Sequence, residues 1–298
     1  MTSFRFFLDW ELNCQFAGLI WAREMGLYKA AGLDVDLISP SAAVAHSVLE
    51  SVLNDPGSAG CMEDNLIVRA CGTGIALRAI GAMLQDTPMV LMTAPDSGIR
   101  ALTHLAGRRV AMHKDGVHLL ETVLTLHGMD PKAADTVVGG WTLGDLINGR
   151  FDAVQGYSIT EPAELRACGF EPLLIPVAHH HLHPYAQMMF TTKQTIEERT
   201  GDLAAFVRVT LDGWQAVFQN AERGGRLVAT VSDEHPDAGT NACIISAMRR
   251  LVVGEDEVLG VMGRERWQRN LMTYAAYGMV EHAVDLDDVI DERFVVGQ

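Results

Sequence analysis

The chain has 298 residues, a length that fits two small domains or one large bilobal unit and excludes a single small module. Hydrophobic residues make up 48% and charged residues 20%, so extended disorder is not expected. The formal net charge of −15 opposes binding to nucleic acids and anionic membranes. No apolar stretch approaches the roughly 20 residues that a membrane-spanning helix needs, so membrane insertion is not expected either.

The beginning of the chain alternates between strand and helix patterns. An apolar run at 4–10 predicts a buried strand, and the alternating residues 33–38 predict a second strand. Apolar residues at helical spacing predict a helix over 17–31, ended by Gly32, and another helix over 42–53. Strands and helices in this order are typical of a parallel α/β sheet.

A similar alternation returns in the middle of the chain, and from Ile196 onward the apolar spacing is mostly helical. The further strands are expected at 107–112, 135–138, 151–156 and 173–177, and the further helices at 66–71, 116–127 and 143–148.

No flexible linker separates the two α/β regions, so we expect the chain to cross between two lobes more than once. The extended apolar segments around 87–92 and 185–190 are the candidate crossings. They predict one lobe made of 1–90 plus 188–298 and a second lobe made of 91–187. In such folds ligands bind at the carboxyl ends of the strands, which predicts a site in a cleft between the lobes.

The five cysteines are irregularly spaced and include no Cys-x-x-Cys pair, so neither a disulfide framework nor a zinc knuckle is predicted. The first residues lack the basic segment, the long apolar core and the cleavage site of a secretory signal. We therefore expect a cytoplasmic protein, or a periplasmic one if a leader was removed.

Several segments resemble a known group of proteins. They read LDW at 8–10, AGLIWAREMGLY at 17–28, AGLDVD at 31–36, LAGRRV at 105–110 and GRFDAVQGY at 149–157, followed by Glu161 and Pro162. They resemble the sulfonate-, nitrate- and pyrimidine-type substrate-binding proteins of ABC importers, and the hydroxymethylpyrimidine phosphate synthases with the same fold. The resemblance implies an α/β, bilobal, periplasmic-binding-protein-like (type II) fold, with two parallel-type sheets flanked by helices and a ligand cleft between the lobes.

The synthase branch carries a lysine that holds pyridoxal phosphate and a histidine that is consumed in the reaction. The resemblance places them near Gly60 and Asp64, where neither residue type is present. The cysteine-rich run that this branch associates with iron falls near 181–185, where histidines stand instead. The known synthase chemistry is therefore not carried over to this chain.

Polar residues follow the first predicted strand, in a loop expected at the rim of the cleft. Trp10 could stack on a planar ligand, and Asp9 or Glu11 could accept hydrogen bonds from an amino group, with Asn13 beside them. The alternative is a core tryptophan and acids that cap the next helix.

Cys14 lies in the same loop, where a helix N-terminus would lower its thiol pKa and make it a nucleophile. A sulfinate desulfinase with this fold uses a cysteine in the equivalent loop, one position away, so the resemblance implies a catalytic candidate. The alternative is a buried cysteine that only fills space.

Glu63, Asp64 and Asn65 follow the next predicted strand of the first lobe. Two carboxylates and an amide could bind a cation, an amidine or the edge of an aminopyrimidine. They could equally stabilise the positive end of the following helix.

In the second lobe, His113, Gly116, Val117 and His118 join a strand to a helix, where the resemblance implies backbone N–H groups that hold an anionic group of the ligand. The alternative is a simple capped turn. Tyr157 and Tyr185 are candidates for the wall of the cleft.

A histidine run, which reads HHHLH at 179–183, is the most unusual segment. In an extended strand, alternate residues share a face, so His179, His181 and His183 could bind one metal ion. Iron and zinc are the candidate metals, and no other cofactor is predicted. A surface loop with weak, accidental metal affinity is the alternative.

The leading hypothesis is a substrate-binding-protein-like receptor for a small planar or amino-bearing metabolite, pyrimidine-like or sulfonate-like, which could carry an anionic group. An ABC permease would be its partner if the protein is exported, and a homodimer is conceivable. The alternative is a cytoplasmic enzyme on the same scaffold, either of the thiamine-pathway type or desulfinase-like, that uses Cys14 or a metal at the histidine run. A ligand-sensing subunit of a cytoplasmic partner is a third hypothesis.

Overall fold

The structure is a computed structural model that describes residues 1–40, 47–179, 181–232, 237–255, 258–280, 282 and 284–295. The chain forms two compact units. The first comprises Met1–Asp86, Tyr185–Trp267 and Val284–Gln298, and the second comprises Thr87–Pro184 and Gln268–Ala283. Within the described residues, every helix is too short or too polar to span a bilayer.

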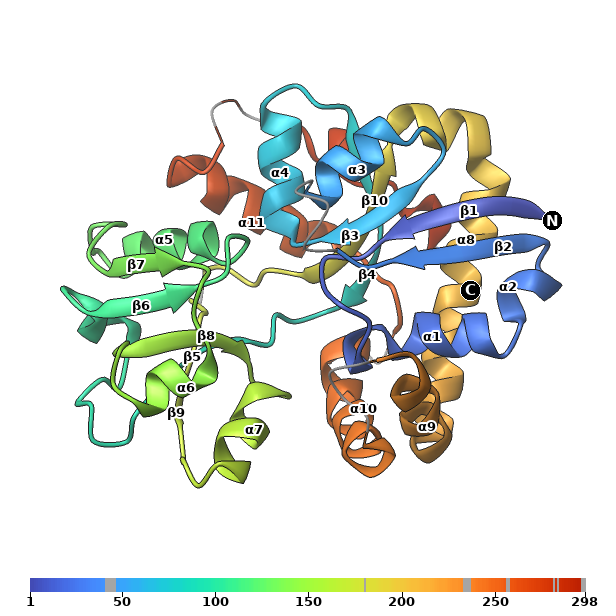
Figure 1. Cartoon of the computed structure of the whole chain (residues 1–298). Helices are drawn as coiled ribbons and strands as arrows, with labels where there is room; N and C mark the ends of the chain where they lie inside the picture. Colours follow the sequence, from blue (N-terminus) through green and yellow to red (C-terminus); the bar gives the residue numbers. More distant parts are fainter. Residues whose placement is uncertain are drawn as a thin grey trace. The chain divides into compact units, whose positions relative to one another are not determined.

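The first unit is built around a five-stranded sheet with the order β2-β1-β3-β10-β4 (Figure 1). Its strands are β1 Thr2–Phe7, β2 Leu33–Ile38, β3 Ala59–Met62, β4 Leu77–Leu84 and β10 Ala186–Thr192. β1 runs parallel to β2 and β3, whereas β10 runs antiparallel to β3 and β4. The carboxyl ends of β1, β3 and β4 and the amino end of β10 therefore meet at one edge.

Helices cover both faces of this sheet, with α3 and α4 on one face and α1 and α8 on the other (Figure 1). The helical segments are η1 Cys14–Phe16, α1 Ala17–Glu24, α2 Leu27–Ala30, α3 Val48–Asn54, α4 Asp64–Gly72, α8 Lys193–Gln219, α9 Ala221–Val231, α10 Ala238–Val253, η3 Leu286–Asp288 and η4 Glu292–Phe294. The aromatic rings of Phe4 and Phe6 on β1 lie 4.7 and 4.8 Å from the ring of Phe206 on α8, which places α8 against the sheet.

The second unit has its own five-stranded sheet, with the order β7-β6-β8-β5-β9. Its elements are β5 Met89–Thr93, η2 Leu102–Leu105, β6 Arg109–Met112, α5 Val117–Leu126, β7 Asp135–Val138, α6 Leu143–Ile147, β8 Ala153–Tyr157, α7 Glu161–Ala167 and β9 Leu173–Pro176. Buried Met92, Phe151, Val154 and Leu165 form part of its core. The helix α11 Arg264–Ala276 starts in the first unit and ends in the second.

The sheets are mixed, which corrects the expectation of two parallel-type sheets. β5 runs antiparallel to β8 and β9, and β10 runs antiparallel to its own neighbours. Both strands come directly after the chain passes from one unit to the other, at Asp86/Thr87 and Pro184/Tyr185. Neighbouring strands run parallel when a helix of the same unit connects them, as in a βαβ unit. β5 and β10 arrive from the other unit without such a helix, so their direction is not restricted to parallel.

The helix expected over 17–31 is broken. Gly26 adopts a left-handed conformation, with φ of 72°, and divides the segment into α1 and α2. Glycine allows this turn because it has no Cβ to clash with the backbone. The strand expected at 4–10 ends at Phe7, which leaves Leu8 to Trp10 in a loop. Part of the helix expected at 42–53 lies outside the described residues.

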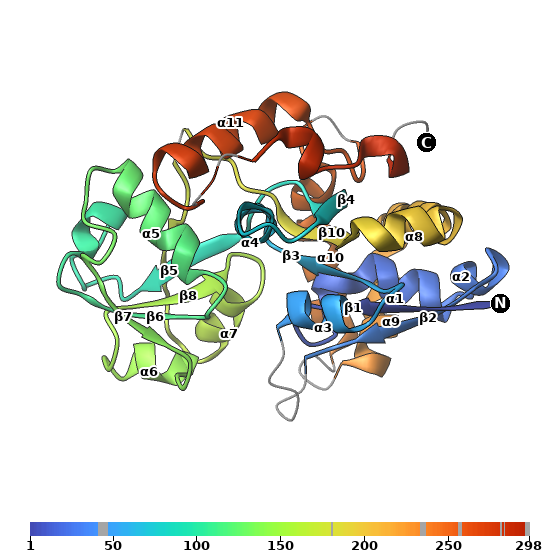
Figure 2. The same ribbon diagram turned by 90° about the horizontal axis from the view of Figure 1, so that it is seen from above.

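α1 packs against α8 in the first unit (Figure 2). Their close contact depends on two glycines that face each other. A Cβ atom at Gly213 would lie 2.2 Å from the carbonyl oxygen of Gly18, and a Cβ atom at Gly18 would lie 2.4 Å from the ring of Trp214. These positions have no room for any larger side chain.

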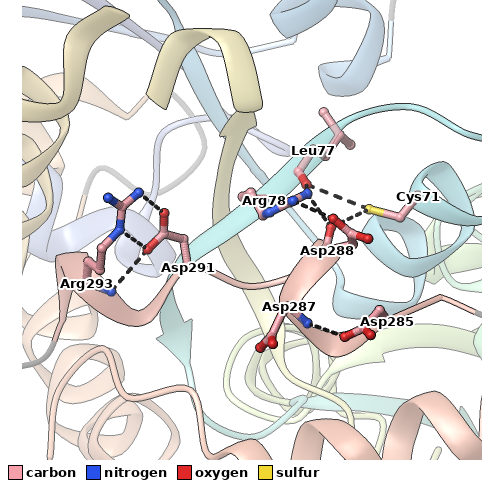
Figure 3. A network of polar contacts seen from close by, with 8 residues as sticks. All are labelled: Cys71, Leu77, Arg78, Asp285, Asp287, Asp288, Asp291 and Arg293. Atoms are coloured by element: carbon pink, nitrogen blue, oxygen red, sulfur yellow. Dashed lines mark hydrogen bonds and ion pairs between the residues drawn. The ribbon is translucent and has the colours of Figure 1, made fainter. Parts of the chain in front are cut away.

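The C-terminal segment is hydrogen-bonded to β4. The N–H of Ala79 donates to the carbonyl of Val289 at 2.7 Å, and the N–H of Asp291 donates to the carbonyl of Ala79 at 2.8 Å. Figure 3 shows the guanidinium group of Arg78 directed at Asp288, whose carboxylate it contacts at 2.7 Å. Residues far apart in the sequence thereby complete the first unit.

Candidate functional site

Polar side chains, most of them buried, meet at the edge of the first sheet where β1 and β3 end and β10 begins. We call Asp9, Gln15, Asp64, Asn65 and Gln187 the polar edge of the first unit. Gln15, Asp64, Asn65 and Gln187 are at most 7% exposed. Polar groups withdrawn from water to this extent need hydrogen-bond partners, either in the protein or in a ligand.

Asp9 lies at the centre of the hydrogen bonds in the polar edge. Its Oδ1 accepts from the side-chain amide of Gln187 at 3.3 Å and from the thiol of Cys61 at 3.4 Å. The same amide of Gln187 donates to Oε1 of Gln15 at 2.8 Å. Burial and the neighbouring Asp9 raise the pKa of Cys61, so its thiol keeps the proton that it donates.

Gln187 has an unusual backbone for a residue in a strand. Its φ is 48°, the only positive φ among the non-glycine residues that the structure describes, and its side chain is fully buried. Such a conformation costs on the order of 1–3 kcal/mol and persists where the surrounding structure requires it. Gln187 was not among the residues predicted from the sequence, although a glutamine within the apolar run AQMMF at 186–190 is the signal that could have found it.

The three predicted residues after β3 are all buried at the start of α4. Glu63 occupies the N-cap position without capping the helix through its side chain, whereas Asp64 lies in the first turn of α4, where a carboxylate favours the positive end of the helix. The carboxylate of Asp64 accepts from the N–H of Tyr185 at 3.1 Å. Neither Oδ1 nor Nδ2 of Asn65 has a hydrogen-bond partner among the described residues, although Asn65 is only 1% exposed.

The loop after β1 separates its predicted residues. Trp10 is 37% exposed, so the alternative in which it belongs to the core is wrong. Glu11 is exposed, and Asn13 caps η1 by accepting from the N–H of Gln15 at 2.8 Å. Asn13 therefore caps the helical turn that Asp9 or Glu11 was expected to cap in the alternative interpretation.

Cys14 lacks the features of an activated nucleophile. It is fully buried, and its thiol donates to Oδ1 of Asn241 at 3.3 Å. Burial raises its pKa to about 12, opposite to the lowering expected at a helix N-terminus. The physical reason is that η1 is a single 3-10 turn, too short to offset the loss of water around the thiolate.

Thiol labelling tests this difference. We expect Ellman's reagent to react with exposed Cys168 and Cys243 at least about a hundredfold faster than with Cys14 and Cys61, because the thiolate is the reactive form and burial suppresses it. Absorbance kinetics of the native protein, with all five thiols counted after unfolding, provide the measurement. Fast labelling of Cys14 would contradict this account.

Tyr185 is buried within the first unit, and its place in the wall of a cleft remains a prediction. Its ring lies 3.7 Å below the guanidinium carbon of Arg266 and 5.6 Å from the ring of Trp267. Its hydroxyl accepts from the N–H of Gly263 at 2.9 Å. The side chain of Tyr185 therefore joins the start of β10 to residues 263–267.

In the second unit, the predicted turn before α5 is organised by Gln155 on β8. The N–H of His113 donates to Oε1 of Gln155 at 2.9 Å, and the ring of His113 lies 4.7 Å from that of Trp141. A Cβ atom at Gly116 would lie 2.3 Å from the same Oε1, so a larger residue there would have to displace the side chain of Gln155 from His113. The N–H of Gly116 donates to the carboxylate of Asp115 at 3.0 Å, so a carboxylate already contacts one of the expected anion donors.

The other predicted residues of this unit are spread along its helices and strands. Val117 begins α5, and the imidazole of His118 lies 3.6 Å from the carboxylate of Glu121. The N–H of Tyr157, at the end of β8, donates to the carboxylate of Glu161 at 2.9 Å. The role of Gly116, Val117 and His118 in holding an anion remains a prediction.

Burial lowers the pKa of His113, although the nearby carboxylates of Asp115 and Glu161 act in the opposite direction. The unfolded chain therefore binds this proton more readily than the folded chain, and stability falls as the pH falls through the pKa of the folded state. Lowering the pH from 7.5 to 5.5 should reduce the free energy of unfolding of both proteins. We expect this reduction to be smaller in His113→Phe than in the unchanged protein, by on the order of 0.5–1 kcal/mol. Urea unfolding at both pH values measures this difference, and equal losses would refute the expectation.

The histidine run forms a turn, whereas an extended strand was expected. The N–H of Leu182 donates to the carbonyl of His179 at 2.8 Å, and the N–H of His181 donates to Nδ1 of His179 at 3.2 Å. The backbone of His183 forms two hydrogen bonds with the side chain of Asn270. His180 lies outside the described residues. Among the residues described, no group of three His, Cys, Asp or Glu side chains has a metal-binding arrangement.

The chain is similar in sequence to proteins of pyrimidine metabolism and binding. A formylaminopyrimidine-binding protein from Halalkalibacterium halodurans is 23% identical over 232 residues, which cover 76% of this chain and 70% of that protein. A 4-amino-5-hydroxymethyl-2-methylpyrimidine phosphate synthase from Legionella pneumophila is 26% identical over 141 residues, which cover 47% and 44%. The chain spans about half the length of this synthase and of a further relative from Haemophilus influenzae.

The fold also matches solved structures. The alkanesulfonate-binding protein SsuA from Xanthomonas axonopodis pv. citri, bound to MOPS, superposes with a TM-score of 0.72 at 13% identity and covers 98% of this chain and 99% of its own. This likeness confirms the periplasmic-binding-protein-like fold. The model of the family described as NMT1/THI5 like matches residues 13–223, which include the loop with Asn13, the start of α4 and β10. The chain therefore belongs to the NMT1/THI5-like family.

Proposed function

We propose that this protein is a substrate-binding receptor for a small planar metabolite that carries an amino group, of the aminopyrimidine class. The observation that carries the proposal is the polar edge of the first unit, where Asn65 is buried with both atoms of its carboxamide unpaired among the described residues. A carboxamide offers a donor and an acceptor side by side, which match the ring nitrogen and amino group of an aminopyrimidine.

The charges of the polar edge favour an amino group over an anion. Asp9 and Asp64 are carboxylates, and buried Glu63 adds a third near the start of α4. An exocyclic amino group donates to such acceptors, whereas a sulfonate would be repelled by them. The similarity to a formylaminopyrimidine-binding protein agrees with this choice. Within the two ligand classes considered, the pyrimidine class is therefore preferred.

The enzyme alternative has less support from these residues. Cys14 is buried, its thiol donates to Asn241 and burial raises its pKa, which does not favour a desulfinase-like nucleophile. Gly60 and Asp64 stand near where the synthases carry lysine and histidine, so that chemistry lacks its reactive groups. If the protein is exported, its partner would be the permease of an ABC importer.

Isothermal titration calorimetry of the full chain tests the proposal. The probes are formylaminopyrimidine, 4-amino-5-hydroxymethyl-2-methylpyrimidine and methanesulfonate. We expect micromolar or tighter binding of a pyrimidine, no binding of methanesulfonate, and an unchanged probe mass after incubation. Binding of methanesulfonate alone would move the protein to the sulfonate class, and conversion of a pyrimidine would establish the enzyme alternative. An absence of binding by both pyrimidines would refute the proposal.

Trp10 is the candidate for stacking on the ring of the ligand. We expect Trp10→Ala to weaken pyrimidine binding about fivefold, because an aromatic contact contributes on the order of 1 kcal/mol. Tyr277→Ala, at an exposed aromatic residue of the second unit, is the control and should not change the affinity. An affinity within about twofold of the unchanged protein would exclude the stacking role.

A further inference from the structure

We infer that Gln187 recognises the amino group of the ligand by accepting a hydrogen bond from it at the side-chain oxygen Oε1. This inference rests on the proposed function and names the residue that determines specificity within it. Gln187 is fully buried, and its Oε1 has no hydrogen-bond partner among the described residues. A buried carbonyl oxygen without a donor is costly to the protein, so it indicates a donor that the protein itself does not supply.

The orientation of the Gln187 amide follows from its neighbours. Oδ1 of Asp9, at 3.3 Å, belongs to a carboxylate and can only accept, so it requires the Nε2 side of the amide. Oε1 of Gln15 accepts from the same Nε2 at 2.8 Å. With Nε2 held by two acceptors, Oε1 is directed away from both of them. The flipped amide would bring two oxygens together at Asp9 and is excluded on that ground.

The backbone of Gln187 supports the same conclusion independently. Its φ of 48° lies in the left-handed region that glycine normally occupies, yet the residue has a long side chain and stands inside β10. Ala186 pairs with Leu84 and Met188 pairs with Ala82, both on β4, so the strand is paired before and after Gln187. Backbone strain of this kind is concentrated where a side chain must be held in one place. Here it holds the amide of Gln187 against Asp9.

These observations define what the ligand must present. Its N–H donor meets Oε1 of Gln187, and the nearby carboxylate of Asp9 favours the same donor-rich group. An exocyclic amino group has two N–H donors and no charge to bury, so it suits this pair of acceptors. A hydrogen or a methyl group in its place would leave Oε1 unpaired, which is the arrangement that gives polar sites their selectivity.

The test couples one protein group to one ligand group. The probes are 4-amino-5-hydroxymethyl-2-methylpyrimidine and its analogue with hydrogen in place of the 4-amino group, titrated into the full chain by calorimetry. We expect the unchanged protein to prefer the amino probe by about thirtyfold, and Gln187→Met, which keeps the side-chain volume, to reduce the preference to about threefold or less. Thr191→Val, which removes another buried polar group from β10, is the matched control and should keep the full preference.

Gln187→Asn provides a second variant in case the methionine does not fold. Asparagine accepts positive φ more readily and shortens the amide by one methylene group, so an intermediate preference is expected. Retention of the full preference by a folded Gln187→Met or Gln187→Asn would overturn the inference and leave the proposed function intact. Equal affinity of the unchanged protein for both probes would also overturn the inference alone. Binding of neither probe, nor of formylaminopyrimidine, would overturn the proposed function and the inference together.

Discussion

Replacing Gly213 by alanine is expected to lower the free energy of unfolding by about 3 kcal/mol, because the new methyl group has no room and must push α1 and α8 apart. Its carbon would lie 2.2 Å from the carbonyl oxygen of Gly18, a backbone atom that cannot rotate away. Urea unfolding followed by circular dichroism measures the change.

The same helix offers a matched control. Gly201 is exposed on α8, and a Cβ atom there would have nothing within 4 Å. Gly201 lies two residues after Arg199, whose backbone is non-helical, so Gly201→Ala should raise stability by at most about 0.5 kcal/mol. If Gly213→Ala and Gly201→Ala changed stability alike, the close contact of α1 and α8 at Gly18 would be wrong.

Replacing Asp9 by alanine is expected to weaken binding of 4-amino-5-hydroxymethyl-2-methylpyrimidine about thirtyfold or more. The change removes a carboxylate that favours the amino group of the ligand. It also leaves the amide of Gln187 and the thiol of Cys61 without their shared acceptor. Truncating one partner of a hydrogen-bonded charged pair costs about 2 kcal/mol or more, which corresponds to this loss of affinity.

Asp34→Ala is the control for the change in net charge. Asp34 is exposed on β2 and lies in the same unit, so its loss alters the charge of the protein without altering the polar edge. Calorimetry should give the same affinity for Asp34→Ala and the unchanged protein. An Asp9→Ala variant that binds as tightly as this control would remove Asp9 from the site.

The sequence was sufficient to predict the fold family and most of the regular elements. β2 lies where alternating residues predicted it, because alternation reports which face of a strand is buried. β7 also lies where a strand was expected, although its residues do not alternate in burial. The break at Gly26 was missed, since a glycine within an apolar helical pattern does not reveal its φ. The residues around Asp9 and Asp64 were also found from the sequence, because parallel strands end at a common edge.

The sequence by itself determined the composition of the polar edge only in part, namely the residues that directly follow β1 and β3. The tertiary structure decided the rest. Gln187 is 178 residues from Asp9 in the sequence. Only the antiparallel insertion of β10 beside β3 brings their side chains together. Tertiary burial likewise decided the state of Cys14, because the pKa of a thiol depends on the water that surrounds it. Local sequence patterns contain neither the long-range pairing of strands nor the solvation of a side chain.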